Sequence, residues 1–170
     1  MTNSDQLALN KKNIDTILVL DFGSQYTQLI ARRVRELDVF SIILPWDISK
    51  EKIASLNPAG IILSGGPESV TKNNTPRIPE IIFELEIPIL GICYGMQTLA
   101  EQFGGQVTTA KTKEFGHASI TLEKTSILFD GFDAGSSIDV WMSHGDHVST
   151  LPDQFNLIAS TPSAPITAMG

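Results

Sequence analysis

The chain has 170 residues, of which 42% are hydrophobic, and a formal net charge of −7. This length is enough for one domain with a substantial core, and the apolar content argues against disorder. The acidic balance disfavours a nucleic-acid partner. The only cysteine, Cys93, excludes an internal disulfide framework and fits a reducing compartment. No apolar run approaches the ~20 residues of a membrane span, so we expect a cytoplasmic protein without a membrane partner.

In the first part of the chain, strand-like apolar runs alternate with helical patterns. Residues 1–14 are polar and are interpreted as a lead-in. The patterns that follow predict, in order, a strand over 16–21, a helix over 25–37, a strand over 40–44, a helix capped by Ser49 and ending at 56, a strand over 60–64, a helix over 79–85, a strand over 88–93 and a helix ending at Phe103. This alternation indicates a parallel sheet that is covered by helices on both faces.

Beyond Phe103 the pattern changes to short strand-like runs with turns between them. They cover residues 106–109, 118–122, 137–141, 156–159 and 166–169, and no helical pattern interrupts them. We therefore expect an antiparallel, strand-rich extension of the sheet.

Cys93 lies where an apolar strand pattern gives way to a helix pattern, with Gly91 and Gly95 two residues to either side. Gly-x-Cys-x-Gly has the layout of a nucleophile elbow, in which glycines leave room for a sharp turn. The start of a helix favours a thiolate, which is the nucleophilic form of cysteine. The alternative is a buried and inert cysteine, which is common in protein cores.

Two other segments, residues 21–24 and 64–67, also follow predicted strands. Functional groups of an open parallel sheet gather beyond the carboxyl ends of its strands, so we expect both segments to share an edge with Cys93. The Ser-Gly-Gly-Pro run at 64–67 is able to point backbone N–H groups at an oxyanion formed beside Cys93. A plain tight turn is the alternative.

Residues 141–147, Trp-Met-Ser-His-Gly-Asp-His, concentrate polar side chains in one short stretch. The stretch is interpreted either as a catalytic or ligand-binding loop or as a polar turn. Metal binding has no further His or Cys cluster to support it, so no metal is predicted. His117 stands alone and is interpreted as structural. A cysteine nucleophile usually needs a histidine base, but spacing alone does not choose among His117, His144 and His147.

Residues 91–97 resemble the nucleophile motif of the class I (triad-type) glutamine amidotransferases. Residues 20–26, 64–67 and 141–146 are similar to the companion motifs of one branch of that family, in the same order, and the resemblance covers residues 15–170. It implies an α/β fold with a flavodoxin-like parallel sheet flanked by helices and a strand-rich C-terminal extension.

The resemblance also implies a glutaminase, in which Cys93 attacks the side-chain amide of glutamine and forms a glutamyl thioester. The backbone N–H groups of Gly66 and Tyr94 would form the oxyanion hole. The residues implied in substrate binding are Gly65, Gln97, Ser143 and His144.

The same branch joins this domain, which has no cofactor of its own, to a synthetase domain that uses ATP and Mg and receives the ammonia. The full-length enzyme would be a homodimer. The family's Phe-His-Pro-Glu segment, which supplies the base and its orienting glutamate, is not found in the chain, nor is the synthetase domain. We therefore expect an amidotransferase domain truncated at its C-terminal end, without appreciable turnover. The alternatives are a subunit of another class I amidotransferase and a non-catalytic binding module on this fold.

Overall fold

The computed structural model describes residues 15–170, and for residues 110–115 and 144 only the backbone. The predicted lead-in, residues 1–14, lies outside the described residues. The chain divides into two compact units: the first runs to Gly66 and also holds Ile78–Ile92, and the second holds Pro67–Arg77 and Cys93–Gly170. Each unit has a sheet of its own.

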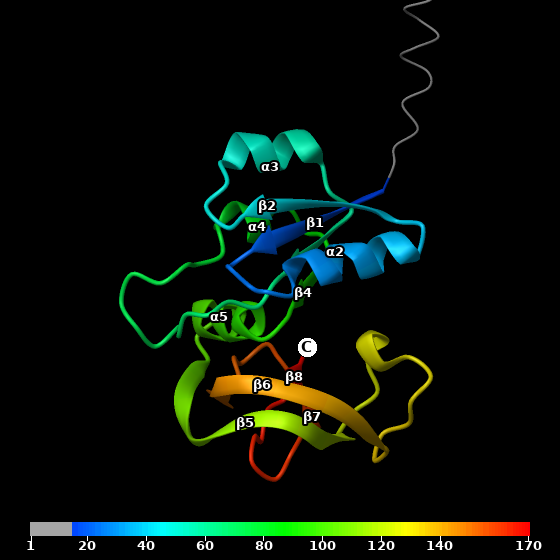
Figure 1. The fold of residues 1–170 in the computed structure, drawn as a ribbon, viewed down its shortest axis with the longest axis vertical. Helices are drawn as coiled ribbons and strands as arrows, with labels where there is room; N and C mark the ends of the chain where they lie inside the picture. The colour runs from blue at the N-terminus through cyan, green and yellow to red at the C-terminus, as the bar shows by residue number, and fades with distance from the viewer. Residues whose placement is uncertain (1–14) are drawn as a thin grey trace, which may run out of the picture. The chain divides into compact units, whose positions relative to one another are not determined.

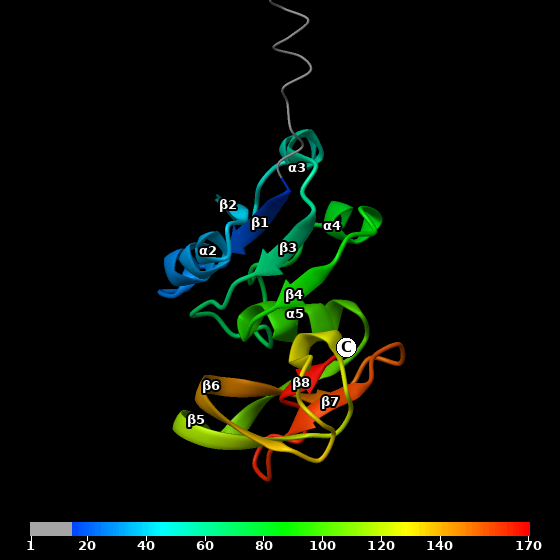
Figure 2. The same cartoon turned by 90° about the vertical axis from the view of Figure 1, so that its right-hand side faces the viewer.

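The first unit is a parallel sheet whose strands are joined by helices (Figure 1). Its four strands run in the order β2-β1-β3-β4, and neighbouring strands are parallel. The elements are β1 (Thr16–Asp21), α2 (Thr27–Glu36), β2 (Phe40–Pro45), α3 (Lys50–Leu56), β3 (Gly60–Leu63), α4 (Ile81–Glu84) and β4 (Ile89–Gly91). Figure 2 shows α2 and α4 on opposite sides of these strands. The predicted flavodoxin-like α/β architecture is confirmed.

Local chemistry accounts for where the helices of the first unit begin. Ser49 caps α3, because its hydroxyl accepts a hydrogen bond from the backbone N–H of Lys52 at 3.3 Å. Helix α2 begins at Thr27 and not at residue 25 as predicted. The Ser24 hydroxyl accepts the N–H of Tyr26 at 3.0 Å, and Thr27 Oγ1 donates to Asp21 Oδ1 at 2.7 Å. This side-chain turn holds the residues before Thr27 outside the helix.

The second unit contains one helix and a second sheet. The elements are α5 (Tyr94–Gln102), β5 (Gln106–Leu122), the 3₁₀ turn η1 (Ile127–Phe129), β6 (Ser137–Thr150), β7 (Leu157–Ser160) and β8 (Ala168–Met169). The strands form a four-stranded sheet of order β6-β5-β7-β8, with antiparallel pairing. The strand-rich extension is confirmed, but it is a separate sheet and not a continuation of the parallel one.

Two further expectations about this unit were wrong. The stretch 141–147 is part of strand β6 and not a loop, and η1 is a short helical turn where none was predicted. Glycine and polar residues made the stretch look like a turn. In the structure it pairs with the long strand β5, and register shifts between Gln106 and Val107 and between Thr109 and Glu114 accommodate its irregularity.

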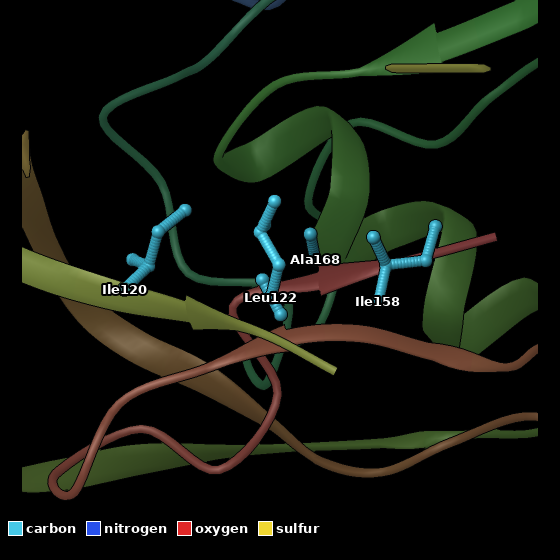
Figure 3. Close-up of a cluster of buried hydrophobic side chains, with 5 residues drawn as sticks. Ile120, Leu122, Ile158 and Ala168 are labelled. Carbon is cyan, nitrogen blue, oxygen red and sulfur yellow. The ribbon is translucent and has the colours of Figure 1, made fainter. Parts of the chain in front are cut away.

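The second sheet has an apolar core on one face (Figure 3). Ile120 and Leu122 alternate with exposed neighbours along β5, which is the pattern of a strand with one buried face. The cluster consists of Ile120, Leu122, Ile158, Ala159 and Ala168, with Phe129, Ile138, Val140 and Met142 packed against it. In residues 15–170, no helix has the length and apolar character needed to cross a membrane.

Candidate active site

Cys93 lies between strand β4 and helix α5, as the elbow motif predicts. Its backbone has φ 52° and ψ −110°, a left-handed conformation that is strained for any residue with a side chain. The backbone N–H of Gln97 donates to the Cys93 carbonyl at 3.0 Å, so the helix starts directly at the cysteine. The cysteine is free and exposed. The predicted strand-to-helix turn at Cys93 is therefore confirmed.

The environment of the thiol favours its neutral form. Burial of the sulfur's surroundings raises the pKa of Cys93, and the charge of Asp146 raises it further, whereas the backbone N–H of Tyr94 lowers it. The residue as a whole is exposed, so this loss of hydration is local to the thiol group. The Sγ–H donates to the Ser143 carbonyl at 3.8 Å. The Tyr94 N–H at the helix start acts in the expected direction, but burial and Asp146 outweigh it, so the pKa of the thiol is raised overall.

A hydrogen bond joins helix α5 to strand β6 about one turn after Cys93. Gln97 is only 6% exposed, and its Nε2 donates to the backbone carbonyl of Asp146 at 2.9 Å. Gln97 and Ser143 were both predicted to bind substrate. Gln97 contacts the backbone of strand β6, and the carbonyl of Ser143, in the same strand, contacts the Cys93 thiol. The contacts leave their roles toward a substrate as predictions. The side chain of His144, also predicted in substrate binding, lies outside the described residues.

The two histidines with described side chains are engaged away from Cys93. His117 Nε2 lies 3.3 Å from Asp139 Oδ1 on the exposed part of the hairpin. His147 Nε2 lies 3.4 Å from Thr108 Oγ1, its cross-strand neighbour. Neither imidazole is hydrogen-bonded to the thiol among the described contacts. Nor does any group of three His, Cys, Asp or Glu side chains in the described part of the chain form a candidate metal site.

The ends of β1 and β3 meet at one edge of the first sheet. The backbone N–H of Phe22 donates to Ser64 Oγ at 3.0 Å, and that hydroxyl donates to the Gly65 carbonyl at 2.8 Å. A Cβ on Gly66 would lie 2.7 Å from the Phe22 carbonyl oxygen, so only glycine fits there. The expected shared edge is confirmed for residues 21–24 and 64–66 within the first unit, and the expectation that Cys93 lies on the same edge stays a prediction. The oxyanion hole of Gly66 and Tyr94 stays a prediction.

Asp146 is the residue that sequence reasoning left without a role. It was noted as part of a polar stretch, but the stretch alone does not tell which of its charged groups acts on the cysteine. In the structure its carboxylate is the charged group that acts on the Cys93 thiol. The sequence did offer one signal: Asp146 is the one acidic residue of the stretch 141–147, close to Ser143 and His144, which were expected to hold a substrate with an ammonium group.

The family profile described as glutamine amidotransferase class-I matches residues 18–169. The chain belongs to the class I glutamine amidotransferase family. Within it, the chain is 57% identical over 159 residues to the glutamine-hydrolysing GMP synthase of Teredinibacter turnerae and 55% identical to that of Ectopseudomonas mendocina. The branch that the companion motifs predicted, that of the GMP synthases, is thereby confirmed.

Solved structures agree with this assignment. A candidate GMP synthase subunit from Thermoplasma acidophilum superposes with a TM-score of 0.79 at 32% identity, covering 92% of this chain and 78% of that one. A glutamine amidotransferase from Methylobacillus flagellatus, with a TM-score of 0.70 and 17% identity, shares the fold. The chain spans 30% of the length of the Teredinibacter and Ectopseudomonas relatives, while 90% of its own length is matched.

Proposed function

We propose that this chain is the glutaminase part of a GMP synthase, which hydrolyses glutamine to glutamate and ammonia. The observation that carries the proposal is the strained, exposed Cys93 between β4 and α5 in a chain with 57% identity to such a synthase. A cysteine held in this conformation at a helix start is the arrangement of an elbow nucleophile. An inert core cysteine would be buried and relaxed.

The chemistry has two steps, an acylation and a hydrolysis. The Cys93 thiolate attacks the side-chain amide carbon of glutamine, a C–S bond forms, and the C–N bond breaks as the leaving nitrogen takes up a proton and departs as ammonia. Water then adds to the glutamyl thioester and releases glutamate and the thiol. The backbone N–H of Tyr94, which already acts on the sulfur, is one oxyanion donor, and the N–H of Gly66 is the second one that the family resemblance implies.

The polar groups around the thiol suit an amino acid substrate. Glutamine carries a fixed ammonium and carboxylate, which need converging polar partners. The Asp146 carboxylate is the negative charge available for the ammonium group. Binding of that group would also offset the charge that now raises the pKa of Cys93, so substrate would favour the nucleophilic form of the enzyme. The remaining substrate contacts are assigned to Gly65, Gln97, Ser143 and His144.

The ammonia would pass to a synthetase domain, which uses ATP and Mg to aminate XMP to GMP. The support for this partner is that the matched region is 30% of the curated GMP synthases. The full-length protein would be a cytoplasmic homodimer, and the glutaminase part needs no cofactor of its own.

The proposal is tested by asking whether glutamine shields Cys93. Because the chain has one cysteine, iodoacetamide uptake reports on that thiol alone. We expect L-glutamine to slow alkylation in a saturable manner, and L-asparagine, which is one methylene shorter, to have little effect. Asp146→Asn should weaken the protection more than it changes alkylation without ligand. Equal rates with and without L-glutamine in the wild-type chain would contradict the proposal.

A further inference from the structure

Helix α5 carries a set of polar contacts to the segment Pro67–Arg77 that the proposed chemistry does not use. The Tyr94 hydroxyl donates to the Pro76 carbonyl at 2.6 Å. The next residue, Arg77, places Nη1 2.6 Å from Glu101 Oε2, near the other end of the same helix. We call Tyr94, Pro76, Arg77 and Glu101 the α5 clasp, and all four belong to the second unit.

The clasp is built more firmly than a surface ion pair. Tyr94 is 1% exposed, so its hydroxyl needs a partner inside the protein, and Pro76 supplies one. Arg77 also donates from Nη2 to the Val70 carbonyl at 2.9 Å. One guanidinium therefore links the backbone of the segment at Val70 to the side chain of Glu101 on the helix. Val70 is buried. A partly buried guanidinium with two fixed acceptors holds its partners more strongly than an exposed pair does.

The clasp is fastened next to the nucleophile. Tyr94 directly follows Cys93, and its backbone N–H is the group that lowers the pKa of the thiol. The strained φ of Cys93 persists only if the surrounding structure holds it. The first residue of α5 is held at its side chain by Pro76, and the helix is held again at Glu101. Helix α5 therefore has a side-chain contact to the segment Pro67–Arg77 near each of its two ends.

We propose that the Tyr94 hydroxyl and the Arg77–Glu101 pair are positioning groups for the nucleophile, holding Cys93 in its strained turn with the Tyr94 N–H aimed at the sulfur. The inference rests on the proposed function, because it assigns these side chains to the reactivity of Cys93 toward a glutamine-like molecule. A clasp that only stabilised the fold would leave thiol chemistry unchanged at temperatures where the protein is folded.

The test uses two chemical probes on the 170-residue chain. The first is a chloroketone analogue of glutamine: the thiolate attacks the carbon that bears chlorine, a C–S bond forms, and chloride leaves. Its kinetics give a maximal rate, kinact, and a half-saturation concentration, KI. The second is iodoacetamide, whose rate against pH gives the midpoint of thiol ionisation without any need for substrate binding.

Three variants remove parts of the clasp. Tyr94→Phe deletes the hydroxyl, Arg77→Met deletes the guanidinium, and Arg77→Lys keeps the charge but not the planar two-donor group. We expect Tyr94→Phe and Arg77→Met to lower kinact about 10- to 100-fold at similar KI, the size expected for a small displacement of a reacting atom. Their alkylation midpoints should rise, because the N–H is then less well aimed, and Arg77→Lys should lie between Arg77→Met and the wild type.

Two further variants separate positioning from stability. Ile120→Val loosens the core of the same unit and should lower the Tm without moving kinact or the midpoint. Arg33→Met removes an exposed ion pair with Glu36 and should change nothing. If the clasp variants match Ile120→Val while the wild type is labelled, the positioning role is wrong and the proposed function stands. If the chloroketone does not label the wild type, the proposed function is wrong, and the alkylation midpoints still decide the clasp.

Discussion

The sheets of the two units differ in how far their side chains are buried. In the first unit, Leu18, Val19 and Leu20 of the central strand β1 are fully buried, as in a sheet covered on both faces. In the second unit, strand β6 exposes Trp141 at 78% while the inward side chains of the same strand pack on the apolar cluster. The first sheet has helices on both of its faces, whereas the second has one face packed on an apolar cluster and one face that is open.

This difference assigns different tasks to the two sheets. The parallel sheet fixes the ends of its strands and the backbone turns that follow them, such as the one at Gly66. The antiparallel sheet brings a backbone carbonyl and a carboxylate to the Cys93 thiol, those of Ser143 and Asp146. Changes at the buried positions of β1 should therefore act mainly on stability, and changes at Asp146 in β6 mainly on the chemistry of Cys93.

The rate of ammonia release should show the greatest difference, because it depends on whether a histidine serves as the base for Cys93. The three histidines of the chain all lie in β5 and β6. His117 contacts Asp139 and His147 contacts Thr108, and no described hydrogen bond joins either to the thiol, so we expect the 170-residue chain to release ammonia from glutamine at least about 10⁴-fold more slowly than an enzyme with a complete triad. The assay is coupled ammonia detection, with Cys93→Ala as the background. Cys93-dependent turnover that disappears in His117→Ala, His144→Ala or His147→Ala would mean that the second sheet does supply a base.

The next effect is on stability. Leu20→Ala empties a fully buried position in β1 and should reduce the free energy of unfolding by about 2–5 kcal/mol. Trp141→Ala, at an exposed position of β6, should change it by no more than about 0.5 kcal/mol. Chemical denaturation followed by circular dichroism measures both. Similar losses for the two variants would break the contrast between a doubly covered and a half-open sheet.

A smaller effect is expected at the turn after β3. Gly66→Ala would bring a Cβ to 2.7 Å from the Phe22 carbonyl oxygen, and that backbone has little freedom to move, so we expect a loss of about 1–3 kcal/mol. The matched control is Gly60→Ala in β3, whose Cβ would meet the mobile end of Ile17 at 3.2 Å and should cost less. A Gly60→Ala variant that is less stable than Gly66→Ala would show that the turn has room to adjust.

The sequence predicted the first unit better than the second for a physical reason. The strand predicted at 16–21 is β1, and the Ser49 cap was found because both depend on residues close in the chain. The long strands β5 and β6 depend on pairing between residues that are distant in the chain. In β6, Gly145 and its polar neighbours have the composition of a turn, so the local pattern did not predict a strand there.

The same reason applies to the candidate site. Cys93 and its junction could be predicted from the local pattern of glycines and apolar residues. The raised pKa of its thiol could not, because that value depends on burial and on the distant Asp146, which is brought near only by the fold. The α5 clasp also joins residues far apart in sequence, Arg77 and Glu101, and no local motif marks it.

The smallest predicted effect is a change in the thiol's ionisation. The Asp146 carboxylate disfavours the thiolate, so Asp146→Asn should lower the pKa of Cys93. At pH values below the pKa, the variant then holds more thiolate than the wild type does. Its alkylation by iodoacetamide should therefore be about two- to five-fold faster than that of the wild type near neutral pH and equal to it at high pH. Asp139→Asn, an exposed change in the same strand, is the control and should leave the profile unchanged. Unchanged alkylation in Asp146→Asn would remove the electrostatic link between β6 and the nucleophile.

Peptide mass spectrometry after treatment with the glutamine chloroketone shows whether Cys93 is the nucleophile of a glutamine site. We expect one adduct per chain on the peptide that contains Cys93, prevented by excess L-glutamine and absent from Cys93→Ser. Saturable glutamine binding without an adduct at Cys93 would contradict the claim and would make the chain a glutamine-binding module in place of a glutaminase.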